Sequence, residues 1–147
     1  MIDQDFMKIA LEEAKQAMLE DEIPVGACLV HDGKVIFRDH NRTKQQRNPL
    51  AHAEKLILDK AHEMGLKYLQ DYILYVTLEP CSMCAGSIIL SRVGRVVFGC
   101  SDPKSGAAGG VFNLLQDANL NHNPQVKRGV LEDNCALLLT DFFRNKR

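Results

Sequence analysis

Residues 72–99 read YILYVTLEPCSMCAGSIILSRVGRVVFG, and this stretch indicates the fold class of the chain. YILYVTL and RVVFG are short apolar runs rich in β-branched and aromatic residues, which is typical of buried strands. Between them, Pro80 opens an apolar segment that is predicted to be a helix, because proline suits the first turn of a helix. A strand, a helix and a second strand therefore follow one another, as in a sheet that is covered by helices.

The same alternation extends on both sides of this stretch. Apolar side chains at helical spacing predict helices, and apolar runs bounded by turn residues predict strands. The hairpin signal Asp32-Gly33 joins two of these runs. The further expected elements are a helix over about residues 4–20, two strands within 23–41, a helix from Ala53 to Met64, a short helix around Phe112–Gln116, a strand near Val126 and a final helix striped from Leu131 to Phe142.

This order of elements predicts an α/β fold in which helices pack on both faces of a mixed sheet. The chain has 147 residues, about the length of one ordinary domain. No repeat, low-complexity segment or linker interrupts it, so we expect residues 1–147 to form a single domain.

Composition favours a globular protein of the cytoplasm. Hydrophobic residues make up 46% of the chain and charged residues 25%, and no apolar run is long enough for a membrane span. The acidic, helical amino terminus does not resemble a signal peptide. Five cysteines at irregular spacing argue against a disulfide framework and favour reduced thiols that pack or bind metal.

The net charge of −1 gives no sign of indiscriminate nucleic-acid binding, but the basic residues are locally concentrated. Residues 40–53 contain no acidic residue and include Arg42, Lys44 and Arg47. The chain ends in RNKR, residues 144–147. Each run by itself is more simply read as solvated surface.

The sequence Pro80-Cys-Ser-Met-Cys84 contains two cysteines at metal-ligand spacing. Cys81 and Cys84 lie three residues apart at a predicted helix start, so both thiols project from the first turn, where the helix dipole favours thiolate. His52 begins another predicted helix, and thiolates together with imidazole select zinc. Two helix starts at the same edge of a sheet can bring these three side chains together.

Other interpretations of the cysteine pair are less satisfactory. A redox pair would have no need of His52 and Glu54. A structural zinc site needs four protein ligands, and the candidates for a fourth, Cys28, Cys100, Cys135 and His122, are not paired in any motif. Of these, Cys28 and Cys135 fall in apolar stripes and are more simply core residues.

Three ligands leave one coordination position for water, which is typical of a catalytic zinc site. This gives Glu54 a role. A carboxylate two residues from a metal ligand can reach the water, take its proton and pass the proton on to a leaving group.

At these residues the sequence resembles the zinc-dependent nucleoside and nucleobase deaminases, the cytidine and deoxycytidylate deaminase superfamily. Their H-x-E…P-C-x-x-C signature is present as His52-Ala53-Glu54 and Pro80 to Cys84. IPVGACLV, SGAAGG, Asn121-His122 and LLLTDFFRNKR are further similar to the branch that deaminates adenosine in bacterial tRNA. The resemblance covers nearly the whole chain.

The resemblance implies a three-layer α-β-α cytidine-deaminase-like fold with a five-stranded sheet. It implies hydrolytic deamination of adenosine to inosine at the tRNA wobble position, with release of ammonia. One zinc ion per subunit would be held by His52, Cys81 and Cys84, and Glu54 would shuttle protons. The side chain of Asn41 and the backbone N–H of Ala53 would orient the purine ring.

The resemblance also implies an RNA-contacting surface and a homodimer. Asp102 and Asn121 match loop positions near the flipped nucleotide and its neighbours. Phe143, Arg144 and Lys146 match the final helix, which would contact the anticodon stem-loop of the tRNA. Phe142, which lies on the apolar stripe, is expected in the core, whereas Phe143 falls off the stripe.

Two competing functions share some of these features. A deaminase of free guanine, cytosine, adenosine or a related nucleoside would have the same zinc site, but the basic segments favour RNA. A riboflavin-pathway deaminase would have more widely spaced cysteines. A non-catalytic, zinc-stabilised RNA-binding module would have no use for Glu54.

Overall fold

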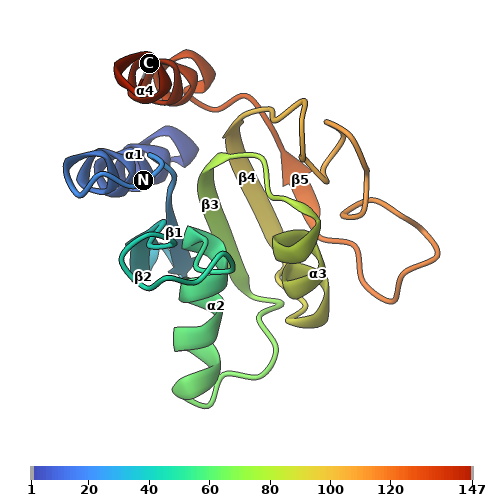
Figure 1. The fold of residues 1–147 in the computed structure, drawn as a ribbon. Helices are drawn as coiled ribbons and strands as arrows, with labels where there is room; N and C mark the ends of the chain where they lie inside the picture. Colours follow the sequence, from blue (N-terminus) through green and yellow to red (C-terminus); the bar gives the residue numbers. More distant parts are fainter. Residues whose placement is uncertain (1, 147) are drawn as a thin grey trace.

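A mixed sheet of five strands forms the centre of the molecule in the computed structural model, which describes residues 2–146 (Figure 1). The spatial order of the strands is β2-β1-β3-β4-β5. β1 is antiparallel to both of its neighbours, whereas β3, β4 and β5 run parallel. The strands are β1 (Gly26–His31), β2 (Lys34–His40), β3 (Tyr72–Leu78), β4 (Arg95–Cys100) and β5 (Gln125–Lys127).

Helices cover both faces of this sheet. α1 (Asp3–Leu19) and α4 (Glu132–Asn145) lie on one face, and α2 (Ala53–Glu63) and α3 (Ser82–Leu90) lie on the other (Figure 1). Successive strand residues divide between the two layers: Leu74 and Val76 pack with α2 and α3, while Tyr75 packs with α1. Burial on both faces explains why the central strands are continuous apolar runs. The three-layer α/β prediction is confirmed.

The hairpin between β1 and β2 is the one that Asp32-Gly33 predicts. Asp32 has φ 51° and Gly33 has φ 74°. Positive φ at both central residues is the requirement of a type I′ turn, which matches the twist of a hairpin.

Strand direction brings two helix starts to the same edge of the sheet. β2 and β3 are both antiparallel to β1, so their carboxyl ends lie at the same edge. The chain leaves β2 at this edge and enters α2 after a loop, and it leaves β3 there and enters α3 after three residues. The first turns of α2 and α3 therefore face a common space.

One expected element is absent and replaced by turns. The predicted helix around Phe112–Gln116 is wrong: in this part of the described chain the backbone forms turns and an isolated bridge between Ala108 and Asn113. Phe112 is exposed and Leu115 is buried, so the segment has no continuous apolar stripe. A five-residue helix without such packing does not recover the cost of its nucleation.

Within residues 2–146, no helix combines the length and the hydropathy that crossing a lipid bilayer would require.

Candidate metal centre and active site

Three side chains that can bind a metal meet at the shared edge of the sheet. His52 is the N-cap residue of α2, Cys81 is the N-cap residue of α3, and Cys84 lies in the first turn of α3. The positive ends of both helix dipoles point into the space between them, which stabilises thiolate there.

The distances between the ligand atoms fit a zinc ion. His52 Nδ1 lies 3.5 Å from Cys81 Sγ and 3.6 Å from Cys84 Sγ. Bonds of about 2.0–2.1 Å to nitrogen and about 2.3 Å to sulfur, at a tetrahedral angle, would separate nitrogen from sulfur by about 3.6 Å. All three ligand atoms lie within 4.8 Å of one another, and the group contains none of Cys28, Cys100, Cys135 or His122 among the described residues. The arrangement matches a site with three protein ligands.

Hydrogen bonds among His52, Cys81 and Cys84 shift their pKa values in a way that favours binding of a cation. A hydrogen bond from Cys84, with a second from His52, lowers the pKa of Cys81 to about 4. The hydrogen bond between His52 and Cys81 raises the pKa of His52. The hydrogen bond between Cys84 and Cys81, together with the burial of Cys84, raises the pKa of Cys84. Cys81 is therefore the first thiolate. A bound cation favours ionisation of Cys84 as well.

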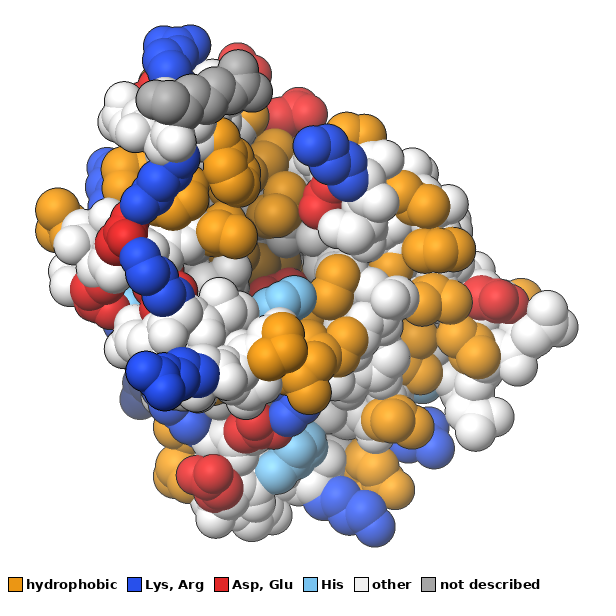
Figure 2. Space-filling model, in the orientation of Figure 1, with side chains coloured by type: hydrophobic (Ala, Val, Ile, Leu, Met, Phe, Trp, Pro, Cys, Tyr) orange, Lys and Arg blue, Asp and Glu red, His pale blue; other side chains and the backbone are white. Residues whose placement is uncertain are grey.

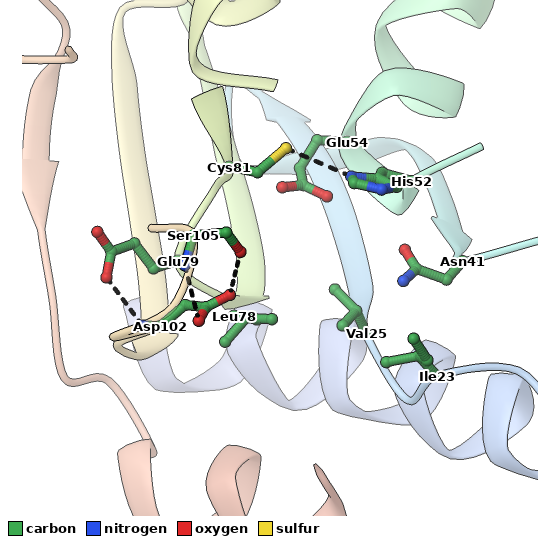
Figure 3. Close-up of a pocket in the computed structure, with 10 residues that line it drawn as sticks. All are labelled: Ile23, Val25, Asn41, His52, Glu54, Leu78, Glu79, Cys81, Asp102 and Ser105. Carbon is green, nitrogen blue, oxygen red and sulfur yellow. Dashed lines mark hydrogen bonds between the residues drawn. The ribbon is translucent and has the colours of Figure 1, made fainter. Parts of the chain in front are cut away.

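Glu54 lies beside this group, in the first turn of α2. Its side chain is 3% exposed and lines the same cavity as His52 and Cys81 (Figure 3). Burial raises the pKa of the Glu54 carboxyl to about 7, so that the neutral and ionised forms are both accessible near neutral pH. The geometry places a carboxylate next to the metal centre, at the position where the sequence predicts a proton acceptor.

A cavity of about 140 Å³ opens in front of these residues. Ile23, Val25 and Leu78 supply apolar side chains to its wall, and the side-chain amide of Asn41 faces it (Figure 3). Asn41 Oδ1 accepts a hydrogen bond of 2.8 Å from the N–H of Ala53. The two groups that were expected to orient a purine are thus bonded to each other in this structure, and the Asn41 amide is held in place by the start of α2.

Asp102 and Ser105 form the opposite rim of the cavity (Figure 3). Asp102 Oδ2 accepts a hydrogen bond from Ser105 Oγ, and Asp102 Oδ1 accepts from the backbone N–H groups of Lys104 and Ser105. Asp102 therefore begins a tight turn, as its position in S-D-P-K suggests, and it also lines the cavity.

A second and larger cavity, of about 540 Å³, adjoins the first. Both cavities are lined by Ile23, Leu78, Asp102 and Ser105, and the second extends to Phe143 of α4. Phe143 is 47% exposed, whereas Phe142 is 9% exposed. The different environments that the sequence predicts for these neighbouring phenylalanines are confirmed.

The two basic segments, in the loop after β2 and at the end of the chain, meet at Asp21. Lys44, from the loop after β2, and Lys146, just after α4, both form ion pairs with Asp21. Arg144 is exposed on the last turn of α4. Figure 2 shows a hollow in this face of the molecule with apolar side chains on its wall, a histidine at its floor and lysine and arginine side chains along one side. Arg147 lies outside the described residues.

Asn121 lies at the other end of the sheet. It is an exposed residue of the loop before β5, and the following residue, His122, donates a hydrogen bond from Nε2 to the carbonyl of Val93, just ahead of β4. The amino ends of these parallel strands are remote from the cavity, which lies at their carboxyl ends. The structure does not bring Asn121 to the cavity of its own chain, and its contact with substrate stays a prediction.

Several residues of the site have no sequence motif. Ile23 and Val25 precede β1, and Leu78 ends β3, so each reads as an ordinary apolar residue until the strands are assembled. Glu79 also lines the cavity and is 2% exposed. A carboxylate inserted between an apolar strand and Pro80 is an unusual feature, and it could have identified Glu79 from the sequence.

Comparison with known sequences gives a consistent result. Residues 1–100 match the model of the cytidine and deoxycytidylate deaminase zinc-binding region. The chain is 48% identical to the tRNA-specific adenosine deaminase of Bacillus subtilis (strain 168) over 146 residues, covering 99% of this chain and 91% of that protein. It is 42% identical to the tRNA-specific adenosine deaminase of Aquifex aeolicus (strain VF5), covering 97% and 94%.

Comparison with solved structures agrees. A structure from studies of A-to-I editing by tRNA:A34 deaminases at the wobble position of transfer RNA superposes with a TM-score of 0.87 at 40% identity, covering 92% of this chain and 99% of that one. The guanine deaminase of Nitrosomonas europaea superposes with a TM-score of 0.83 at 23% identity, over 96% of this chain and 84% of that one, and so shares the fold. With its His-Cys-Cys centre and its adjoining carboxylate, the chain belongs to the zinc-binding cytidine and deoxycytidylate deaminase family, in the branch of the tRNA-specific adenosine deaminases.

Proposed function

We propose that this protein converts adenosine to inosine at the wobble position of a tRNA and releases ammonia. The observation that carries the proposal is the three-ligand centre of His52, Cys81 and Cys84 with the buried carboxylate of Glu54 beside it; His52, Cys81 and Glu54 line one cavity, and Cys84 is buried behind them. Relatives over nearly the full chain length that are named tRNA-specific adenosine deaminases support the choice of substrate.

The chemistry divides between the metal and Glu54. Zinc held by these three ligands would supply Lewis-acid activation of water. Glu54 would carry both protons that water loses: the first goes to N1 of adenine as the water oxygen adds to C6, and the second goes to the 6-amino group, which leaves as ammonia when its bond to C6 breaks. The net reaction replaces the amino group with the oxygen of water. Burial of Glu54 keeps its proton away from bulk solvent between the two transfers.

Asn41 is suited to hold the base over the metal centre. Its amide oxygen is fixed by the N–H of Ala53, which leaves its amide group oriented toward the cavity. The apolar side chains of Val25 and Leu78 can contact the faces of a planar ring. A purine placed between them would meet one polar group that fixes its orientation, the usual composition of a ligand site.

The second cavity and the basic residues at the end of α4 favour RNA over a free nucleoside. A flipped nucleotide in a chain brings neighbouring nucleotides, which a free nucleoside lacks, and the adjoining space along Asp102 and Phe143 could receive them. Arg144 and Lys146 lie at the end of α4, the helix whose Phe143 lines the second cavity, and would supply phosphate contacts there. Asn121 would join this surface only from another subunit.

We further propose that the protein is a single-domain homodimer of the cytoplasm. Family resemblance motivates the dimer, and all four helices that residues 2–146 form pack on one sheet, which favours one domain. Light scattering on the purified protein tests the dimer. A monomer across micromolar concentrations would contradict it.

A substrate comparison tests the proposed reaction. Purified, zinc-loaded protein is incubated with an anticodon stem-loop that carries adenosine at the wobble position, with the same loop carrying that adenosine one position away, and with free adenosine, cytidine and guanine. Inosine is measured by mass spectrometry of digested nucleosides, and ammonia by a coupled assay. We expect turnover of the first substrate above all others.

Matched variants complete the test. Glu54→Ala should abolish turnover, whereas Glu63→Ala, an exposed glutamate of the same helix, should not change it. Turnover of free guanine or free adenosine at least equal to that of the stem-loop would overturn the RNA assignment and make a nucleobase deaminase the better reading.

A further inference from the structure

Glu79 is a buried carboxylate that the deamination chemistry does not use. It lies between the end of β3 and the Pro80-Cys81 pair, and it is 2% exposed. Its side chain points away from His52 and Glu54, toward the segment 101–110 that follows β4 (Figure 3). Burying a carboxylate costs desolvation free energy unless hydrogen bonds compensate it. The hydrogen-bond partners of Glu79 therefore indicate its role.

The partners of the Glu79 carboxylate are three backbone N–H groups of that segment. Oε1 accepts from Asp102 at 2.9 Å, and Oε2 accepts from Ala108 and from Gly110, each at 2.8 Å. Hydrogen bonds to an ionised acceptor are stronger than those between neutral groups. One side chain thus holds the segment at both of its ends.

The segment approaches the carboxylate more closely than ordinary residues could. A Cβ added to Gly106 would lie 2.3 Å from Glu79 Cδ, and one added to Gly110 would lie 2.7 Å from Glu79 Oε1. Gly106 and Gly110, the first and last glycines of SGAAGG, therefore allow a close backbone approach to Glu79.

The anchored segment carries the rim of the substrate cavity. Asp102 and Ser105 line both cavities, and the backbone N–H of Asp102 is one of the three groups that Glu79 binds. We infer that Glu79 is a positioning residue, which fixes the 101–110 segment as the wall of the nucleotide site and so governs how tightly RNA is bound. This inference rests on the proposed function for the identity of its substrate.

The segment also touches the metal centre, which gives the inference a definite competitor. Ala107 N–H donates to the Pro80 carbonyl at 2.8 Å, and Gly106 forms a bridge with Cys81. If the main role of Glu79 were to support Cys81, its loss would lower zinc content and kcat. A role in the nucleotide wall would instead raise KM for RNA and leave zinc in place.

Glu79→Gln tests this with little change of shape. An amide offers one acceptor oxygen, and its NH₂ group must face at least one of the three backbone donors. Keeping the oxygen at the Ala108 and Gly110 side leaves the N–H of Asp102 without an acceptor. We expect hydrogen exchange of the Asp102 amide to become ~10–100-fold faster, as measured by NMR. We expect KM for the anticodon stem-loop to rise ~10–100-fold, with zinc content and kcat within about twofold of the parent protein.

Two further variants keep the test decisive. Gly106→Ala pushes on the same carboxylate, because the added Cβ would lie 2.3 Å from Glu79 Cδ, and it should have the same signature, which decides the question if Glu79→Gln does not fold. Asp117→Asn is the matched control, because Asp117 also accepts a backbone N–H bond, from Asn119 at 2.9 Å, in the same connection but away from the cavity. It should change neither KM nor the exchange of Asp102.

The outcomes separate the inference from the proposed function. Unchanged exchange at Asp102, or unchanged KM, in both Glu79→Gln and Gly106→Ala overturns the inference. Loss of zinc with an unchanged KM also overturns it, in favour of the support of Cys81. If the parent protein itself does not act on the stem-loop, the proposed function fails, while exchange at Asp102 still decides whether Glu79 anchors the wall.

Discussion

Replacing Glu54 with glutamine should have opposite effects on activity and on stability. The change keeps the shape of the side chain and removes its ability to accept a proton. A lost acid–base group costs ~10²–10⁴ in rate, which corresponds to about 3–5 kcal/mol of transition-state stabilisation. Zinc content should remain, because His52, Cys81 and Cys84 are unchanged. Single-turnover deamination of the stem-loop, with metal analysis on the same sample, measures both.

The stability effect follows from the buried position of Glu54. Burial raises the pKa of its carboxyl from 4.5 to about 7 in the folded chain. The folded state therefore binds this proton more tightly than the unfolded state, and stability falls as the pH rises between these two values. The resulting loss of stability in the zinc-free protein above pH 7 is on the order of a few kcal/mol. A nearby cation reduces this penalty.

Glu54→Gln should therefore be more stable than the parent protein at pH 8 in the zinc-free form, and about equally stable at pH 4.5. Urea unfolding of chelated protein at both pH values measures this. Glu63→Gln, on the exposed side of the same helix, is the control and should change neither quantity. Appreciable turnover by Glu54→Gln, or a variant less stable than its parent at pH 8, would refute the reasoning.

Three other changes give separate tests. Cys84→Ala should lower zinc content and melting temperature together, as measured by metal analysis and calorimetry; full zinc occupancy would contradict the ligand set. Arg144→Ala with Lys146→Ala should weaken stem-loop binding and flatten its salt dependence by about 0.7 in log–log slope for each lost phosphate contact, and an unchanged slope would exclude such contacts. Asp3→Asn should destabilise the fold by about 1.5–3 kcal/mol at pH 7, because its charged hydrogen bonds with Arg95 hold the pKa of Asp3 well below its usual range. This difference should shrink as the pH falls below about 4, and denaturant unfolding across pH measures it.

Most elements and the chemistry of the centre could be predicted from local sequence. The run from Tyr72 to Gly99 predicts strand, helix and strand because local preferences and burial pattern agree there, and Asp32-Gly33 predicts the hairpin because few residues tolerate positive φ. The H-x-E and P-C-x-x-C spacings identify a metal centre because ligand chemistry restricts the residue types that can serve. The same local reasoning was wrong at Phe112–Gln116, where turns bury Leu115 in the core and leave Phe112 exposed, without a helix.

The way in which distant residues meet depends on how the chain packs in three dimensions. The antiparallel placement of β1 between β2 and β3 brings His52 to Cys81 and Cys84, and strand order cannot be read from any local pattern. The cavity wall of Ile23 and Leu78, and the hydrogen bonds that Glu79 accepts from a segment more than twenty residues away, likewise depend on chain packing. Local sequence sets what each side chain can do. Its partners are set by non-local contacts, which exist only once the helices and the sheet have buried their common core.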